Sequence, residues 1–172
     1  GLDAEQVLVL STGVIGVPLP LEKVTAGLAR AVQALSEDGG PDAAQAILTT
    51  DTRPKQALVA RDGFVVGGMA KGAGMIHPAL ATMLAVLTTD YPLTRHEAET
   101  FLRPAVEDSF NRISVDGECS TNDAVVLLAN GASGCGRNDE SFAAALNEVC
   151  SELAAQSVAD GEGTTVVLEI DV

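Results

Sequence analysis

The sequence is poor in aromatic residues. Its 172 residues include four phenylalanines, one tyrosine and no tryptophan, so that aromatic side chains make up 3% of the chain. Hydrophobic residues nevertheless account for 47%, which is enough to bury a substantial core. Because large rings are scarce, we expect alanine, valine and leucine to fill most of that core.

Positive charge is also scarce. The chain has 10 lysines and arginines against 24 acidic residues, which gives a formal net charge of −14. A protein that binds nucleic acid needs a basic surface to contact phosphates, so this balance excludes that class of protein. We interpret the acidic excess as favouring solubility rather than as selecting a partner.

Long apolar runs and paired cysteines are missing too. The runs Met83–Leu87 and Ala124–Ala129 fall far short of the roughly 20 residues that a transmembrane helix needs. No signal peptide opens the chain. The cysteines, Cys119, Cys135 and Cys150, are odd in number and lack CxxC spacing, and no His, Asp and Glu cluster has metal-ligand spacing. We therefore expect a cytoplasmic protein without a membrane contact, a metal or a cofactor, and with Cys150 in the core.

Helical and strand patterns alternate along the chain. Turn signals and apolar spacing predict strands at 7–10, 46–50, 56–60, 64–67, 82–88, 123–129 and 164–172. They predict helices at 20–35 and 42–46, a third that opens with a capping box at Thr94 and contains Pro104, and a fourth capped by Asp139. Pro104 should kink its helix or leave a carbonyl unpaired. This interleaving indicates an α/β or mixed α+β fold.

The length suits one domain, and no repeat or linker divides it, so we expect residues 1–172 to form a single domain. The chain begins at Gly1 without a methionine and ends directly after a predicted strand. Both features suggest a piece of a longer protein.

The stretch Lys71–Leu84 carries the strongest sign of chemistry. It runs from the glycine-rich turn Gly72-Ala73-Gly74 through Pro78 to Thr82, which opens an apolar run. A threonine in this position can attack the preceding carbonyl, and the resulting N-to-O acyl shift cuts the chain and frees an α-amine. With a pKa near ~8, that amine can act as base for the threonine's own hydroxyl. By itself the pattern is more typical of an ordinary turn followed by a buried strand.

Four further segments accompany this stretch in order: Ser11–Gly16 (STGVIG), Thr49–Lys55 (TTDTRPK), Cys119–Asp123 (CSTND) and Asp160–Gly163 (DGEG). Together with KGAGMIHPALATMLAVLTTD, they make the chain similar to the ornithine acetyltransferase family, the bifunctional glutamate N-acetyltransferases of arginine biosynthesis. The resemblance covers nearly the whole chain. It implies cleavage between Ala81 and Thr82 into an α piece and a β piece that stay associated in an oligomer.

The activity implied by the resemblance is an acetyl transfer. Thr82 would take acetyl from N-acetylornithine as an ester and pass it to glutamate, and acetyl-CoA is an alternative donor for some family members. Thr12 and Gly13 would form the oxyanion hole, a task that suits a hydroxyl and a glycine N–H after a strand end. The family's substrate-binding positions correspond here to Thr49, Lys71, Thr82 and Glu162.

One departure from the family pattern concerns the residues after DGEG. The family usually continues with Ala-Thr-Lys, whereas this chain has Thr164-Thr165-Val166. We interpret His77 as a bystander and residues 120–123 as turn residues that support the backbone. Two rival hypotheses remain open at this stage. One is a self-cleaving aminopeptidase or amidohydrolase on a related scaffold, and the other is a non-catalytic α/β domain.

Overall fold

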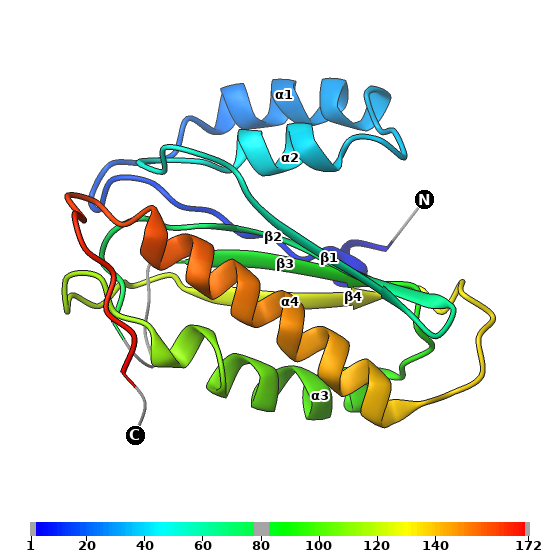
Figure 1. Cartoon of the computed structure of the whole chain (residues 1–172). Coiled ribbons are helices and arrows are strands. Elements are labelled where there is room, and N and C mark those ends of the chain that lie inside the picture. The colour runs from blue at the N-terminus through cyan, green and yellow to red at the C-terminus, as the bar shows by residue number, and fades with distance from the viewer. Residues whose placement is uncertain (1–2, 78–82, 171–172) are drawn as a thin grey trace.

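The computed structural model describes residues 3–77 and 83–170. Its centre is a four-stranded sheet, and Figure 1 shows α4 and α3 side by side on one face of it. The strands are β1 (Lys55–Arg61), β2 (Phe64–Lys71), β3 (Leu84–Thr89) and β4 (Ala124–Ala129). The helices are α1 (Leu21–Gln33), α2 (Gly40–Ala46), α3 (Arg95–Glu107) and α4 (Asp139–Ala159), with short 3-10 turns η1 (Ala4–Gln6) and η2 (Phe110–Arg112). The mixed α+β class predicted from the sequence is confirmed.

The sheet follows the order of the chain, β1-β2-β3-β4. β1 and β2 form the predicted hairpin, in which Asp62 and Gly63 both have positive φ, as a tight hairpin turn requires. β2 pairs with β3 antiparallel, and β3 pairs with β4 parallel across the α3 crossover. All of the predicted strands between residues 56 and 129 are therefore present within the described residues.

The core lies between the sheet and α4. Phe142, Leu146, Val149 and Leu153, the predicted face of that helix, are all fully buried. The core also contains several of the few aromatic residues. Phe64, Tyr91 and Phe142 contact one another, and Tyr91 stacks on Phe142 with ring centroids 4.5 Å apart. Such pairs add to the stabilisation from burial.

Three predicted strands are not strands in the structure. Residues 7–10 form an exposed irregular segment after η1, residues 46–50 span the end of α2 and the loop after it, and residues 164–170 are irregular and exposed. Their sequences are apolar enough for strands, but none has a neighbouring strand among the described residues to supply hydrogen bonds. A strand needs such a partner to satisfy its backbone, so pattern alone did not decide these segments.

The predicted helices are present, with differences at their ends. α1 forms where its apolar spacing predicts, yet none of its residues is buried. The capping box of α3 is confirmed: Thr94 and Glu97 bond to each other's backbone, and the helix continues through Pro104 to Glu107. α4 is capped by Asn138, whose side chain accepts from the N–H of Ser141, and not by Asp139 as predicted. None of the helices in residues 3–77 and 83–170 combines the length and apolar character needed to cross a bilayer.

Candidate functional site

Ends of all four strands meet at one edge of the sheet, where Lys71 lies. In the pairing register Leu84 lies opposite Lys71 on one side and opposite Ala124 on the other. The last residue of β2 and the first residues of β3 and β4 are therefore neighbours. Lys55, the first residue of β1, lies opposite Ala70 at the same edge.

Lys71 presents a buried cation at this edge. Its side chain is about 2% exposed, and its Nζ lies 3.4 Å from Oγ1 of Thr49, which the family resemblance pairs with it. Burial lowers the pKa of Lys71, while the negative charges of Asp51 and Asp123 act against that shift. A desolvated lysine beside a hydroxyl is suited to bind the carboxylate of a substrate.

Residues 47–54, between α2 and β1, form a loop that we call the Thr49 loop. Asp51 ties this loop to the end of β2. One of its carboxylate oxygens accepts the N–H of Gly72 at 2.7 Å, and the other accepts the N–H of Thr49 at 3.2 Å. The bond to Gly72 fits the φ of +144° at that residue, a conformation that only glycine adopts easily. Asp51 thus fixes Thr49 and Lys71 relative to each other.

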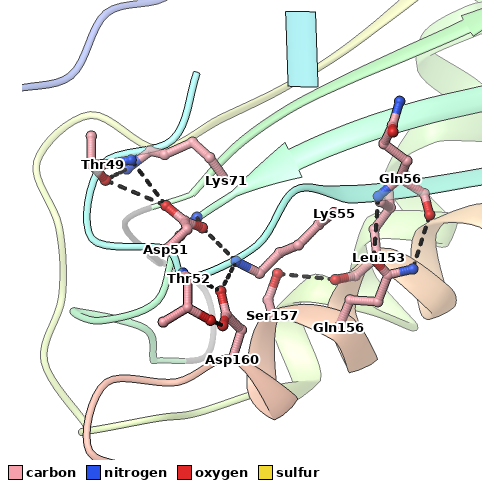
Figure 2. Close-up of polar contacts among 11 residues, drawn as sticks. Thr49, Asp51, Thr52, Lys55, Gln56, Lys71, Leu153, Gln156, Ser157 and Asp160 are labelled. Atoms are coloured by element: carbon pink, nitrogen blue, oxygen red, sulfur yellow. Dashed lines mark hydrogen bonds and ion pairs between the residues drawn. The ribbon is translucent and has the colours of Figure 1, made fainter. Parts of the chain in front are cut away.

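A second lysine, Lys55, lies below this pair and is completely buried (Figure 2). Its ammonium group contacts a carboxylate oxygen of Asp51 and lies 2.7 Å from Oδ2 of Asp160, the C-cap residue directly after α4. Asp160 in turn accepts bonds from the N–H and the hydroxyl of Thr52. The cluster Asp51, Thr52, Lys55 and Asp160 therefore joins the Thr49 loop, the start of β1 and the end of α4.

The carboxylates of this cluster are held in their charged form. Burial alone would raise the pKa of Asp51, but hydrogen bonds from Lys55, Gly72 and Thr49 outweigh burial, and the pKa lies below its ordinary value. The pKa of Asp160 is lowered in the same way, against burial, by Lys55 and Thr52. Opposite charges in contact favour ionisation of both partners.

Glu162 reaches the same region from the end of α4. Its backbone N–H donates to the carbonyl of Ala73 at 2.6 Å. A Cβ placed on Gly74 would lie 3.0 Å from the Glu162 carboxyl carbon, so Gly74 leaves space that the carboxylate occupies. Glu162 is exposed. The structure therefore places Lys71 beside Thr49, and Glu162 beside Ala73 and Gly74, which follow Lys71 in the chain.

The predicted oxyanion residues are linked to the same edge through β4. The side-chain amide of Asn122 donates to the carbonyl of Ser11 at 2.6 Å, which fixes the segment that contains Thr12 and Gly13 beside residues 120–123. Asp123 follows and accepts the N–H of Met83 at 2.7 Å. Thr12 is partly buried and Gly13 is exposed, and no contact within the described residues joins either of them to Lys71.

Ala81 and Thr82, the predicted cleavage site and nucleophile, lie outside the described residues. Met83, the next residue in the chain, is described and is buried before β3. His77 is exposed, and its ring Nδ1 lies 3.4 Å from the hydroxyl oxygen of Ser114. Cys150 is buried with its pKa raised to about 12 by desolvation, which makes it a core residue as predicted. In residues 3–77 and 83–170 no group of His, Cys, Asp and Glu is arranged to hold a metal ion.

Sequence reasoning missed Lys55, Asp160 and Asp51 as site residues, and it assigned Asp123 only a turn. All four lie inside segments singled out from the sequence. Had the predicted strand 56–60 been extended by one residue, its alternation would have put Lys55 on the face of Ala57 and Val59. A charged residue on the buried face of a strand is a signal for a buried partner. The partner itself, Asp160, is 105 residues away in the chain and could be identified only in the structure.

Fold and site together define a mixed α+β protein with a buried cation and an acidic residue at one sheet edge. The family model of ArgJ matches residues 1–172, and the chain belongs to the ArgJ family. It is 51% identical over 99% of its length to the arginine biosynthesis bifunctional protein ArgJ of Streptomyces avermitilis. It is 50% identical over 99% to that of Thermobifida fusca. The chain spans 45% and 44% of these curated relatives.

Proposed function

We propose that this chain is the central part of an acetyltransferase that cuts itself before Thr82 and then transfers acetyl from N-acetylornithine to glutamate. The observation that carries the proposal is that Lys71 lies beside Thr49 at the sheet edge where β3 begins, two residues after the sequence position of Thr82, and that Glu162 bonds to the nearby Ala73. Relatives that share about half of its residues are named as bifunctional proteins of arginine biosynthesis.

The cut would begin with attack of the Thr82 hydroxyl oxygen on the carbonyl carbon of Ala81. The C–N bond breaks as the ester forms, and the hydroxyl proton passes to the nitrogen. Water then hydrolyses the ester, which leaves a carboxylate on Ala81 and a free amine on Thr82. That amine can act as base for the hydroxyl beside it.

In the transfer, the Thr82 hydroxyl attacks the acetyl carbonyl of N-acetylornithine and gives its proton to the amine. The hydroxyl of Thr12 and the N–H of Gly13 would stabilise the oxyanion. Ornithine leaves with a proton, and the amino group of glutamate then attacks the acetyl ester to give N-acetylglutamate. Lys71 suits the carboxylate that both substrates carry, and Glu162 suits the ammonium group of ornithine.

The wider assignments belong to the same proposal. The α piece, ending at Ala81, and the β piece, beginning at Thr82, would remain together in a heterotetramer in the cytoplasm. The transfer itself requires no metal or cofactor. The residues 1–172 would act as one domain of the longer protein.

The first test is the intact mass and N-terminal sequence of the full-length protein and two variants. Wild type should show a new N-terminus at Thr82, and Thr82→Ala should remain uncut. Thr88→Ala, which changes an exposed threonine on β3, should cut like wild type. With N-acetylornithine, wild type should gain one acetyl group and release it to glutamate. An uncut wild-type chain would refute the proposal, and release of acetate without N-acetylglutamate would assign amide hydrolysis instead.

A further inference from the structure

The two buried lysines at this edge of the sheet differ in their partners. Lys55 contacts a carboxylate oxygen of Asp51 and lies 2.7 Å from Oδ2 of Asp160. Lys71 belongs to none of the ion pairs in the part of the chain that the structure describes, and its Nζ lies 3.4 Å from the hydroxyl oxygen of Thr49. A buried cation without a carboxylate in contact is costly, so Lys71 is suited to receive an anion from outside.

Asp51 lies between the Thr49–Lys71 pair and the ammonium group of Lys55 (Figure 2). Its Oδ1 accepts the N–H of Gly72 at 2.7 Å and contacts Lys55, and its Oδ2 accepts the N–H of Thr49 at 3.2 Å. Both carboxylate oxygens therefore have other partners. Asp51 attracts Lys71 without pairing with it, and Lys55 repels Lys71. The ammonium group of Lys71 keeps a stabilising charge nearby and stays available to a ligand.

Two further acidic residues lie on the other sides of Lys71. Asp123, directly before β4, attracts Lys71 and accepts hydrogen bonds from the N–H of Met83, at 2.7 Å, and from the side chain of Ser120. Glu162, beyond the glycine-rich turn, is exposed. Neither of them forms an ion pair with Lys71 among the residues described.

We propose that Asp51 and Lys55 are positioning residues for Lys71: Asp51 sustains the charge of Lys71, and Lys55 holds Asp51 so that it does not neutralise that charge. The ligand that this arrangement receives is a carboxylate. The inference rests on the proposed function only in taking Lys71 as the residue that binds a substrate carboxylate.

Asp51 and Lys55 act on the proton of Lys71 in opposite directions. A nearby anion favours the protonated ammonium group, and a nearby cation disfavours it. At alkaline pH Lys71 loses its proton and with it the attraction for a carboxylate. Removing the charge of Asp51 should therefore move this loss to lower pH, and removing the charge of Lys55 should move it to higher pH. Without Lys55, Asp51 can also pair with Lys71 and compete with the ligand.

The test measures the binding of glutarate to the full-length protein by calorimetry, from neutral to alkaline pH. Glutarate has two carboxylates and no amine, so its own charge stays constant over this range, and it has no acetyl group to transfer. The variants are Asp51→Asn, Lys55→Met and Lys71→Arg. The matched control is Asp160→Asn, because Asp160 is the other partner of Lys55 but is not among the charges that act on Lys71. Circular dichroism shows which variants fold.

Wild type should bind glutarate at neutral pH and lose it at alkaline pH. In Asp51→Asn the loss should move to lower pH by roughly one unit, and in Lys55→Met it should move to higher pH by a similar amount. Lys55→Met should also bind glutarate about tenfold more weakly at neutral pH, since the ligand then competes with a carboxylate worth about one pKa unit. Asp160→Asn should lose stability without moving the pH of the loss. A purely structural role for the cluster would give no shifts of opposite sign.

A folded Asp51→Asn or Lys55→Met protein with the pH dependence of wild type would overturn the inference, and so would a wild type that does not bind glutarate. Should neither variant fold, Lys71→Arg decides: its guanidinium stays charged, so the alkaline loss should disappear, and a loss that persisted would not belong to Lys71. None of these results depends on the cut. An uncut wild-type chain would refute the proposed function, while glutarate binding would still judge the roles of Asp51 and Lys55.

Discussion

At the scale of single residues, Lys55 shows how much a buried charge depends on its partners. Its ammonium group is shielded from water and lies between the carboxylates of Asp51 and Asp160. Removing one partner of a buried ion pair leaves an uncompensated charge, which is far more costly than losing an exposed pair. The cluster therefore holds the Thr49 loop and the end of α4 in place only while all of its members are present.

Lys55→Met should lower the free energy of unfolding by about 3–5 kcal/mol at pH 7. The control is Arg61→Met, which breaks the exposed pair with Glu148 and should cost less than about 1 kcal/mol. Urea denaturation followed by circular dichroism measures both. Equal losses in the two variants would mean that the buried cluster contributes no more than a surface ion pair.

The same cluster gives a pH dependence with a definite sign. The pKa values of Asp51 and Asp160 in the folded protein lie below the ordinary value of 3.8. Their stabilisation is therefore present above about pH 3.8 and is lost as the pH falls through the folded values. The difference between wild type and Lys55→Met should shrink over that acid range, and a difference that grew in acid would contradict the assignment.

Residue patterns indicated the candidate site residues but not the residues that hold them in place. Lys71, Thr49 and Glu162 follow from the family motifs, and in the structure Lys71 lies beside Thr49 while Glu162 lies beside Gly74. Lys55 and Asp160 are joined across 105 residues, and the hydrogen bond that the Met83 N–H donates to Asp123 depends on the register of two parallel strands. Pair contacts of this kind are properties of the folded topology, which short motifs do not encode.

At the scale of elements, the contact of β2 with α4 depends on a residue without a side chain. A Cβ on Gly68 would lie 2.6 Å from Cδ2 of Leu87, 3.0 Å from Cδ1 of Leu153 and 3.2 Å from Cγ1 of Val149. Leu87 belongs to the neighbouring strand, while Leu153 and Val149 belong to α4. Gly68 thus lets the helix pack closely on the sheet.

Gly68→Val should destabilise the protein by about 1–3 kcal/mol, because overpacking forces the buried side chains and α4 to move. Gly67→Val is the matched control, since a Cβ there would meet nothing nearer than 3.7 Å. Thermal or urea unfolding compares the two variants. If Gly67→Val were as destabilising as Gly68→Val, the close packing of α4 would not be the cause.

Helices and strands were predicted well where the sequence carries a local signal such as a helix cap or a hairpin turn. The capping box of α3 and the β1–β2 hairpin carry local signals in the sequence, and both are present. The segments 7–10 and 164–170 carry only an apolar pattern, and they have no partner strand among the described residues. Sequence shows that a segment can be a strand, but a neighbouring strand decides whether it is one.

At the scale of the whole molecule, burial is uneven. Residues of α4 fill the core, whereas α1 exposes its entire apolar stripe, including Leu21, Leu28 and Val32 at 60% or more. We expect the amides of α1 in the 172-residue chain to exchange with deuterium much faster than those of α4, because few buried contacts oppose local opening. Hydrogen exchange followed by mass spectrometry tests this. Equal protection of the two helices would contradict it.

The ladder between β2 and β3 has a further consequence for the proposed cut. β2 precedes Ala81 and β3 follows Thr82, so the pairs from Lys71–Leu84 to Val66–Thr89 join the two would-be pieces across one sheet. Each piece alone would expose an unpaired strand edge, which invites aggregation. A cut that waits for the sheet to form avoids this hazard. The ratio of intact to cut chain in a cell extract would then report directly how much of the newly made protein had folded.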